Sequence, residues 1–159
     1  MKSFLKKKNM IDLNQKLSEN FTLNEFIDSK VAKKKKIDNT PTLLVISHLK
    51  ELCLRLLQPF RDYYGKPIIV TSGYRCPALN DAVNGVKTSS HLYGNGADLL
   101  PADGDFEAFL LAWDNYLNEH PEQKYDEIII EKSKKEKWLH TAYKSAVGKQ
   151  RMKYLTLEV

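Results

Sequence analysis

The chain has 159 residues, of which 42% are hydrophobic and 28% charged, and its formal net charge is +5. This size suits one domain with its own core, and neither an internal repeat nor a low-complexity tract is present. The two cysteines, Cys53 and Cys76, leave a single disulfide open but exclude a disulfide framework or a thiolate zinc site. No segment is long and apolar enough to cross a membrane, so we expect no membrane partner.

The positive charge is concentrated in short lysine runs at residues 6–8, 33–36 and 132–135. No helix-turn-helix or aromatic-interleaved basic motif accompanies them, so we expect no nucleic-acid partner, and steeply salt-dependent oligonucleotide binding would contradict this. The basic start of the chain is not followed by the apolar stretch of a signal peptide. We therefore expect a monomer that is made in the cytoplasm and reaches any target outside it by another route.

The first part of the chain is predicted to be helical. Residues 1–20 are polar and are expected to form a flexible tail. Thr22 and Glu25 have the spacing of a capping box, which predicts a short helix that carries Phe26 and Ile27 into the core. A second helix is expected to start with Thr40 as N-cap and Pro41 at the first helical position. Its apolar stripe follows at helical spacing: Val45, Leu49, Leu52, Leu56 and Phe60.

The second part is predicted to be richer in strands. Residues 68–71 and 97–100 are apolar runs typical of buried strands, and residues 128–130, 138–142 and 152–157 complete the predicted strands. Helices are expected at residues 77–83 and 106–117. The predicted fold is α+β, with a small, mainly antiparallel sheet and helices packed on one side. Residues 21–159 are predicted to form a single domain.

Two histidines and one aspartate are candidate metal ligands. His91 and Asp98 are seven residues apart in a stretch rich in Ser, Gly and Asn, and His140 lies on a predicted short strand. Two imidazoles and one carboxylate form a donor set typical of catalytic zinc, with the fourth position left for water. These residues alone leave two alternatives open. One is that His140 binds no metal, and the other is that Asp98 serves in a turn or as a helix cap.

Three separated motifs resemble those of a known family. They are Ser72-Gly73-Tyr74-Arg75, the stretch from Ser89 through His91 and Gly94 to Ala97-Asp98, and Trp138-x-His140. In this order they are similar to the motifs of the D-Ala-D-Ala carboxypeptidase family of zinc peptidases. That family includes dipeptidases and phage L-alanyl-D-glutamate endopeptidases that cut peptidoglycan stem peptides. The resemblance implies a hedgehog/D-Ala-D-Ala-peptidase-like fold for residues 21–159 and zinc binding by His91, Asp98 and His140.

The resemblance also implies roles for residues around the metal. Arg75 is expected to hold a substrate carboxylate or the developing oxyanion, although it is also a possible structural partner of the metal-binding aspartate. Ser89 and Tyr74 are expected to help bind the substrate. Many members carry an acidic residue three positions before the last histidine, where this chain has Lys137.

The general base is therefore sought among nearby acidic residues. Glu131, at the end of a predicted strand, is favoured because a strand holds it rigidly, and Glu136 is the alternative. Asp126 and Glu127 are expected to be surface or structural residues.

The expected activity is zinc-dependent hydrolysis of a peptide bond in peptidoglycan stem peptides, of the carboxypeptidase or the endopeptidase type. A phage endolysin is one form of this activity, and the protein would act at the cell wall once released. The alternative is an inactive module that keeps zinc and binds the cell wall or a partner.

Overall fold

The computed structural model describes residues 10–159, and the first part of the predicted tail, residues 1–9, lies outside this range. The described part of that tail is folded at its end, because β1 (Lys16–Ser18) pairs antiparallel with β2 (Phe21–Thr22). Leu17 on β1 is only 3% exposed and belongs to the hydrophobic core. The folded domain thus begins before residue 21, and the predicted boundary was too late.

The capping box is confirmed. Helix α1 (Leu23–Ile27) begins after Thr22, whose backbone N–H donates to Glu25 Oε2 at 2.7 Å. Phe26 is fully buried in the core. A second short helix, α2 (Lys30–Lys35), follows and is capped by the hydroxyl of Ser29.

The predicted start of the next helix was wrong by two residues. Helix α3 (Leu43–Leu52) begins after Thr42, whose hydroxyl oxygen accepts the backbone N–H of Val45 at 3.2 Å. The hydroxyl of Thr40 instead donates to the carboxylate of Asp38 at 2.6 Å. The apolar stripe was predicted correctly, because all five of its residues are at most 8% exposed.

The helix continues past α3 through a π-helical segment (Cys53–Leu57) into α4 (Gln58–Tyr64). Pro59 lies inside this continuation and lacks the N–H that would bond to the carbonyl of Arg55 in an α-helix. That carbonyl accepts the side-chain N–H of Gln123 at 2.9 Å instead. The proline is therefore tolerated, and the hydrogen bond from Gln123 connects this helix to the segment before β5 (Glu127–Lys132). Cys53 and Cys76 are both free.

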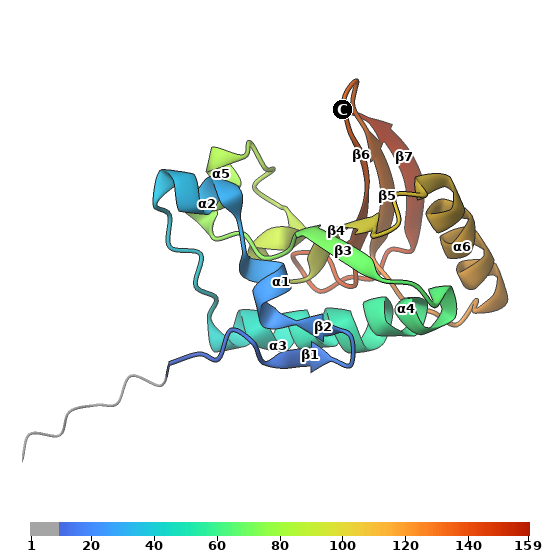
Figure 1. Ribbon diagram of the computed structural model, residues 1–159, viewed down its shortest axis with the longest axis horizontal. Helices are drawn as coiled ribbons and strands as arrows, with labels where there is room; N and C mark the ends of the chain where they lie inside the picture. The colour runs from blue at the N-terminus through green and yellow to red at the C-terminus, as the bar shows by residue number, and fades with distance from the viewer. Residues whose placement is uncertain (1–9) are drawn as a thin grey trace, which may run out of the picture.

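The main sheet has five strands in the order β3-β4-β6-β5-β7 (Figure 1). These are β3 (Ile68–Ser72), β4 (Gly96–Pro101), β5 (Glu127–Lys132), β6 (Lys137–Ala142) and β7 (Lys153–Glu158). All neighbours are antiparallel except β5 and β7, which are parallel. This confirms the predicted α+β fold with a mainly antiparallel sheet. The strand at residues 68–71 was expected to be buried, but β3 is an edge strand and its Ile69 is 48% exposed.

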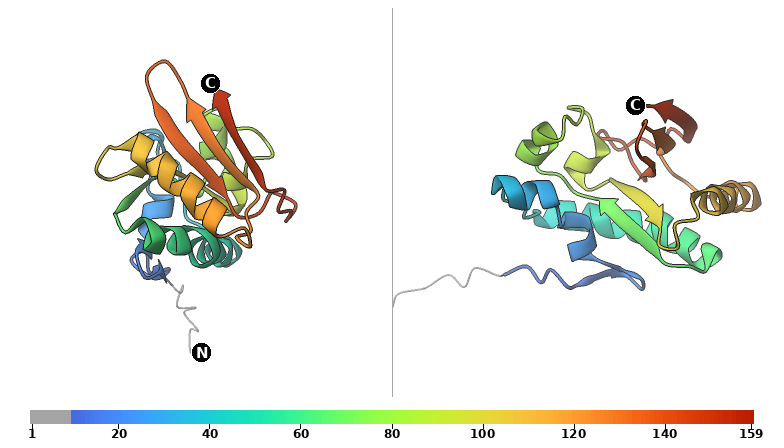
Figure 2. Two further views of the ribbon diagram at one scale, coloured as in Figure 1. Left: turned by 90° about the vertical axis from the view of Figure 1, so that its right-hand side faces the viewer. Right: turned by 45° about the horizontal axis from the view of Figure 1, so that its top comes forward.

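The sheet has a core face and an open face, because successive side chains of a strand point to opposite sides. Ala97, Leu99 and Leu139 are fully buried on the core face, which α6 (Phe106–Glu119) covers. Asp98 and His140 alternate with these residues and therefore lie on the open face. The short helix α5 (Pro77–Ala82) lies on that side of the sheet, opposite α6 (Figure 2). Within residues 10–159, the structure has no helix with the length and apolarity of a membrane span.

Candidate metal centre

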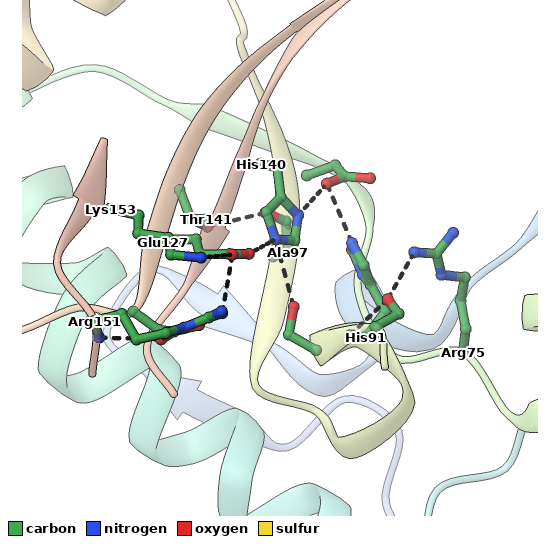
Figure 3. A network of polar contacts seen from close by, with 12 residues as sticks. Arg75, His91, Ala97, Glu127, His140, Thr141, Arg151 and Lys153 are labelled. Atoms are coloured by element: carbon green, nitrogen blue, oxygen red, sulfur yellow. Dashed lines mark hydrogen bonds and ion pairs between the residues drawn. The ribbon is translucent and has the colours of Figure 1, made fainter. Parts of the chain in front are cut away.

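The three predicted metal ligands meet at one point on the open face of the sheet (Figure 3). Asp98 on β4 and His140 on β6 are direct partners in the antiparallel register, and His91 comes from a 3₁₀ turn (Ser90–Tyr93). The carboxylate oxygen Oδ1 of Asp98 lies 3.2 Å from His91 Nε2 and 2.9 Å from His140 Nδ1. One ligand atom from each residue lies within 4.8 Å of the other two.

Two glycines allow the chain to return from His91 to Asp98. Gly94 ends the 3₁₀ turn with a φ of 73°, a left-handed conformation that favours glycine. Gly96 packs so closely against the turn that an added Cβ would lie 2.3 Å from Ser90 Oγ. Gly94 thus provides the left-handed turn, and Gly96 allows the close approach of the strand to the turn.

The outer nitrogen of each imidazole has its own contact. Nδ1 of His91 lies 2.6 Å from the carbonyl oxygen of Gly73, which can only accept, so Nδ1 carries the proton and the lone pair of Nε2 faces the cluster. Nε2 of His140 lies 3.4 Å from Ser90 Oγ and 3.9 Å from Glu127 Oε2, while its Nδ1 faces Asp98. In both rings, therefore, one nitrogen faces the centre of the cluster and the other lies near a neighbouring polar group.

This arrangement fits a zinc ion. Tetrahedral zinc with bonds of about 2.0–2.2 Å places its ligand atoms about 3.3–3.6 Å apart. The two nitrogen–oxygen distances of 2.9 and 3.2 Å are close to this range. Two imidazoles and one carboxylate leave one position of a tetrahedron open, as in catalytic sites. His91, Asp98 and His140 are thus the residues that would hold the metal.

The electrostatics of the cluster keep the carboxylate ionised. Burial acts to raise the pKa of Asp98, but the charges and hydrogen bonds of the two imidazoles outweigh burial and lower it well below its usual range. Burial lowers the pKa of His91, and Asp98 opposes this shift only in part. For His140, burial also acts to lower the pKa, but the hydrogen bond and charge of Asp98, together with the charges of Glu131 and Glu127, outweigh burial and the pKa is raised. An ionised carboxylate is the form that binds a metal.

A cavity of about 760 Å³ lies over the cluster and is lined by all three of its residues. Arg75 and Ser89 form part of its wall, and Arg75 Nη2 donates to Ser89 Oγ at 3.3 Å. The Nε of Arg75 is buried and has no hydrogen-bond partner in the described part of the chain. Burial lowers the pKa of this guanidinium, although Asp98 and Glu131 oppose the shift. The wall of the cavity therefore includes a guanidinium whose Nε has no hydrogen-bond partner in the described residues.

The two candidate bases lie in different places. Glu131 on β5 is half-buried and lines the cavity, where burial first and then the charge of Asp98 raise its pKa. Glu136 is exposed in the hairpin between β5 and β6, and it does not line the cavity. Lys137, which stands where many family members have an acid, pairs with Glu107 of α6 at 3.0 Å.

Tyr74 and Glu127 lie where the sequence did not predict them. Tyr74 is 8% exposed, belongs to the hydrophobic core and lines a different cavity, so it does not line the cavity over the metal cluster. Glu127 was expected on the surface or in a structural role, but it lines the cavity and contacts His140. The alternation of β5, which places Glu127 on the same face as Glu131, was the signal in the sequence.

The family model for Peptidase M15 matches residues 19–142. The matched segment contains the three metal-binding candidates together with Arg75, Ser89 and Glu131, and it ends before β7. Comparison with curated proteins gives no match.

Proposed function

The chain belongs to the peptidase M15 family of zinc D-Ala-D-Ala carboxypeptidase-like peptidases, and we propose that it hydrolyses a peptide bond in the stem peptides of peptidoglycan. The observation that carries the proposal is the cluster of two buried histidines, His91 and His140, with the partly exposed Asp98, which lines a cavity. Zinc in this cluster would supply Lewis acidity, which activates water near neutral pH and polarises a scissile carbonyl.

Glu131 is the proposed general base. Its carboxylate takes the proton of the attacking water as the oxygen adds to the scissile carbonyl, and it passes this proton to the leaving amine as the C–N bond breaks. Its position in the cavity wall and its raised pKa support this role, because a pKa closer to neutral suits a group that both accepts and returns a proton. Glu136 is exposed outside the cavity, which favours Glu131.

Arg75 is proposed to bind the negative charge of the substrate. Its buried, unpartnered Nε and its contact with Ser89 leave a fixed cation in the cavity. Such a guanidinium can hold a substrate carboxylate or the oxyanion that forms on the scissile carbonyl. We assign substrate contacts to Arg75 and Ser89 and not to Tyr74, whose side chain belongs to the core.

The bond that is cut distinguishes a D-Ala-D-Ala carboxypeptidase from an L-Ala-D-Glu endopeptidase, such as a phage endolysin acting at the cell wall. The experiment is digestion of purified peptidoglycan with and without a chelator, with mass spectrometry of the released fragments. We expect cleavage that the chelator abolishes and added zinc restores. Absence of chelator-sensitive cleavage would contradict the proposal, and zinc retained without cleavage would indicate a module that only binds.

A further inference from the structure

Glu127 at the start of β5 joins the metal cluster to a second set of charged residues. Its side chain is 22% exposed, and its two oxygens point to different partners (Figure 3). Oε2 lies 3.9 Å from Nε2 of His140. Oε1 lies 2.9 Å from Nη2 of Arg151 and 4.0 Å from Nζ of Lys153. The cations on one oxygen hold the carboxylate with its other oxygen toward the imidazole.

Arg151 is itself fixed by a buried carboxylate. Its Nε and Nη2 donate to the two oxygens of Asp126 at 2.8 and 2.7 Å, and the side chain of Asp126 is only 1% exposed. The backbone N–H of Arg151 donates to the same carboxylate at 3.1 Å. Hydrogen bonding to Asp126 raises the pKa of Arg151 further, so the guanidinium stays charged. Nη2 is shared between Asp126 and Glu127, which makes Arg151 the link between them.

A second group lies near the same nitrogen of His140, namely the hydroxyl of Ser90 at 3.4 Å. A hydroxyl donates or accepts, whereas an ionised carboxylate only accepts. Ser90 therefore fits either tautomer of His140, whereas the negative charge of Glu127, at 3.9 Å, favours a proton on Nε2. A proton there leaves the lone pair of Nδ1 for a metal.

We propose that Glu127, held in place by Arg151, is a positioning residue for His140. It keeps the proton on Nε2, turns Nδ1 toward the metal and so raises the affinity of the site for zinc. Arg151 lies outside residues 19–142, so the C-terminal segment that ends in β7 contributes to the metal centre. The inference rests on the proposed metal centre and is independent of which bond is cut.

The test is the zinc affinity of the full chain, measured by competition with a chromophoric chelator. Loss of an outer partner of a ligating histidine typically weakens metal binding by about 10–100-fold, and we expect this loss for Glu127→Ala. Glu127→Gln keeps an acceptor oxygen and should recover part of the affinity. Glu107→Ala is the matched control, because it removes a carboxylate that also pairs with a cation but lies on α6, on the other side of the sheet, and its zinc affinity should stay close to that of the unchanged chain.

The unfolding of the metal-free proteins separates positioning from folding. We expect Glu127→Ala to unfold at a similar temperature to the unchanged chain while its zinc affinity falls. A zinc affinity of Glu127→Ala within about threefold of that of the unchanged chain, or an equal loss in Glu107→Ala, would overturn the inference. If Glu127→Ala does not fold, Glu127→Gln is used in its place, and a zinc affinity equal to that of the unchanged chain would overturn the inference. An unchanged chain that binds no zinc would instead contradict the metal centre itself.

Discussion

Replacing Glu131 with Gln removes the proposed base while keeping the size of the side chain. Burial and the charge of Asp98 raise the pKa of Glu131 in the metal-free chain. A raised pKa means that folding favours the protonated, neutral form, so the ionised carboxylate at neutral pH works against folding. The neutral amide removes this cost. We therefore expect metal-free Glu131→Gln to unfold at the same urea concentration as the unchanged chain, or at a higher one.

The expected loss of activity is large. General base catalysis contributes about 10²–10⁴-fold, which at about 1.36 kcal/mol per tenfold corresponds to about 2.7–5.4 kcal/mol of transition-state stabilisation. We expect kcat/KM to fall by this factor while the zinc content stays the same. In the unchanged chain, activity should decline as the pH falls through the pKa of Glu131, because the base is then protonated. The remaining activity of Glu131→Gln should lack this acidic limb.

The assay is chromatographic measurement of stem-peptide cleavage by zinc-loaded protein across a range of pH. Glu136→Gln is the matched control, since it makes the same chemical change on the exposed hairpin. We expect the control to retain its activity and its acidic limb. A Glu131→Gln protein with activity within about tenfold of the unchanged chain, or a larger loss in Glu136→Gln, would refute the reasoning.

Three further predictions concern the metal and the fold. Asp98→Asn replaces a charged ligand with a neutral one. Loss of an outer partner of a ligand weakens metal binding by up to about 100-fold, and we expect a larger loss of zinc affinity for this variant. One zinc per chain after dialysis against a chelator would contradict this. Thr42→Ala removes the cap of α3 and should lower the free energy of unfolding by about 1 kcal/mol, measured with urea, whereas an equal loss in Thr40→Ala would show that the cap is misassigned. Phe60 is fully buried, and its ring stacks on that of Trp113 with centroids 3.6 Å apart. Phe60→Ala should lower the free energy of unfolding by about 3–5 kcal/mol in the same measurement. A decrease below about 1 kcal/mol would contradict this packing.

Features that depend on neighbouring residues could be predicted from the sequence. The capping box of Thr22 and Glu25 follows from a spacing of three residues, and the buried stripe of α3 and α4 follows from helical periodicity. The alternation of β6 separates His140 from Leu139 in the same way. The helix start was harder to predict, because Thr40 and Thr42 are both capable caps. In the structure Thr42 caps the helix, while the hydroxyl of Thr40 donates to Asp38.

The sequence by itself thus determined the α+β class, most of the helices and strands, and the residue types suited to zinc. Only the tertiary structure decided which of these residues meet. Asp98 and His140 are 42 residues apart and face each other because β4 and β6 pair in one register. The pairing of β5 with β6 places Glu131 in the cavity wall and Glu136 in the exposed hairpin. The contact of Glu127 with Arg151 depends on β7, which returns parallel to β5, and local spacing does not specify such long-range pairing.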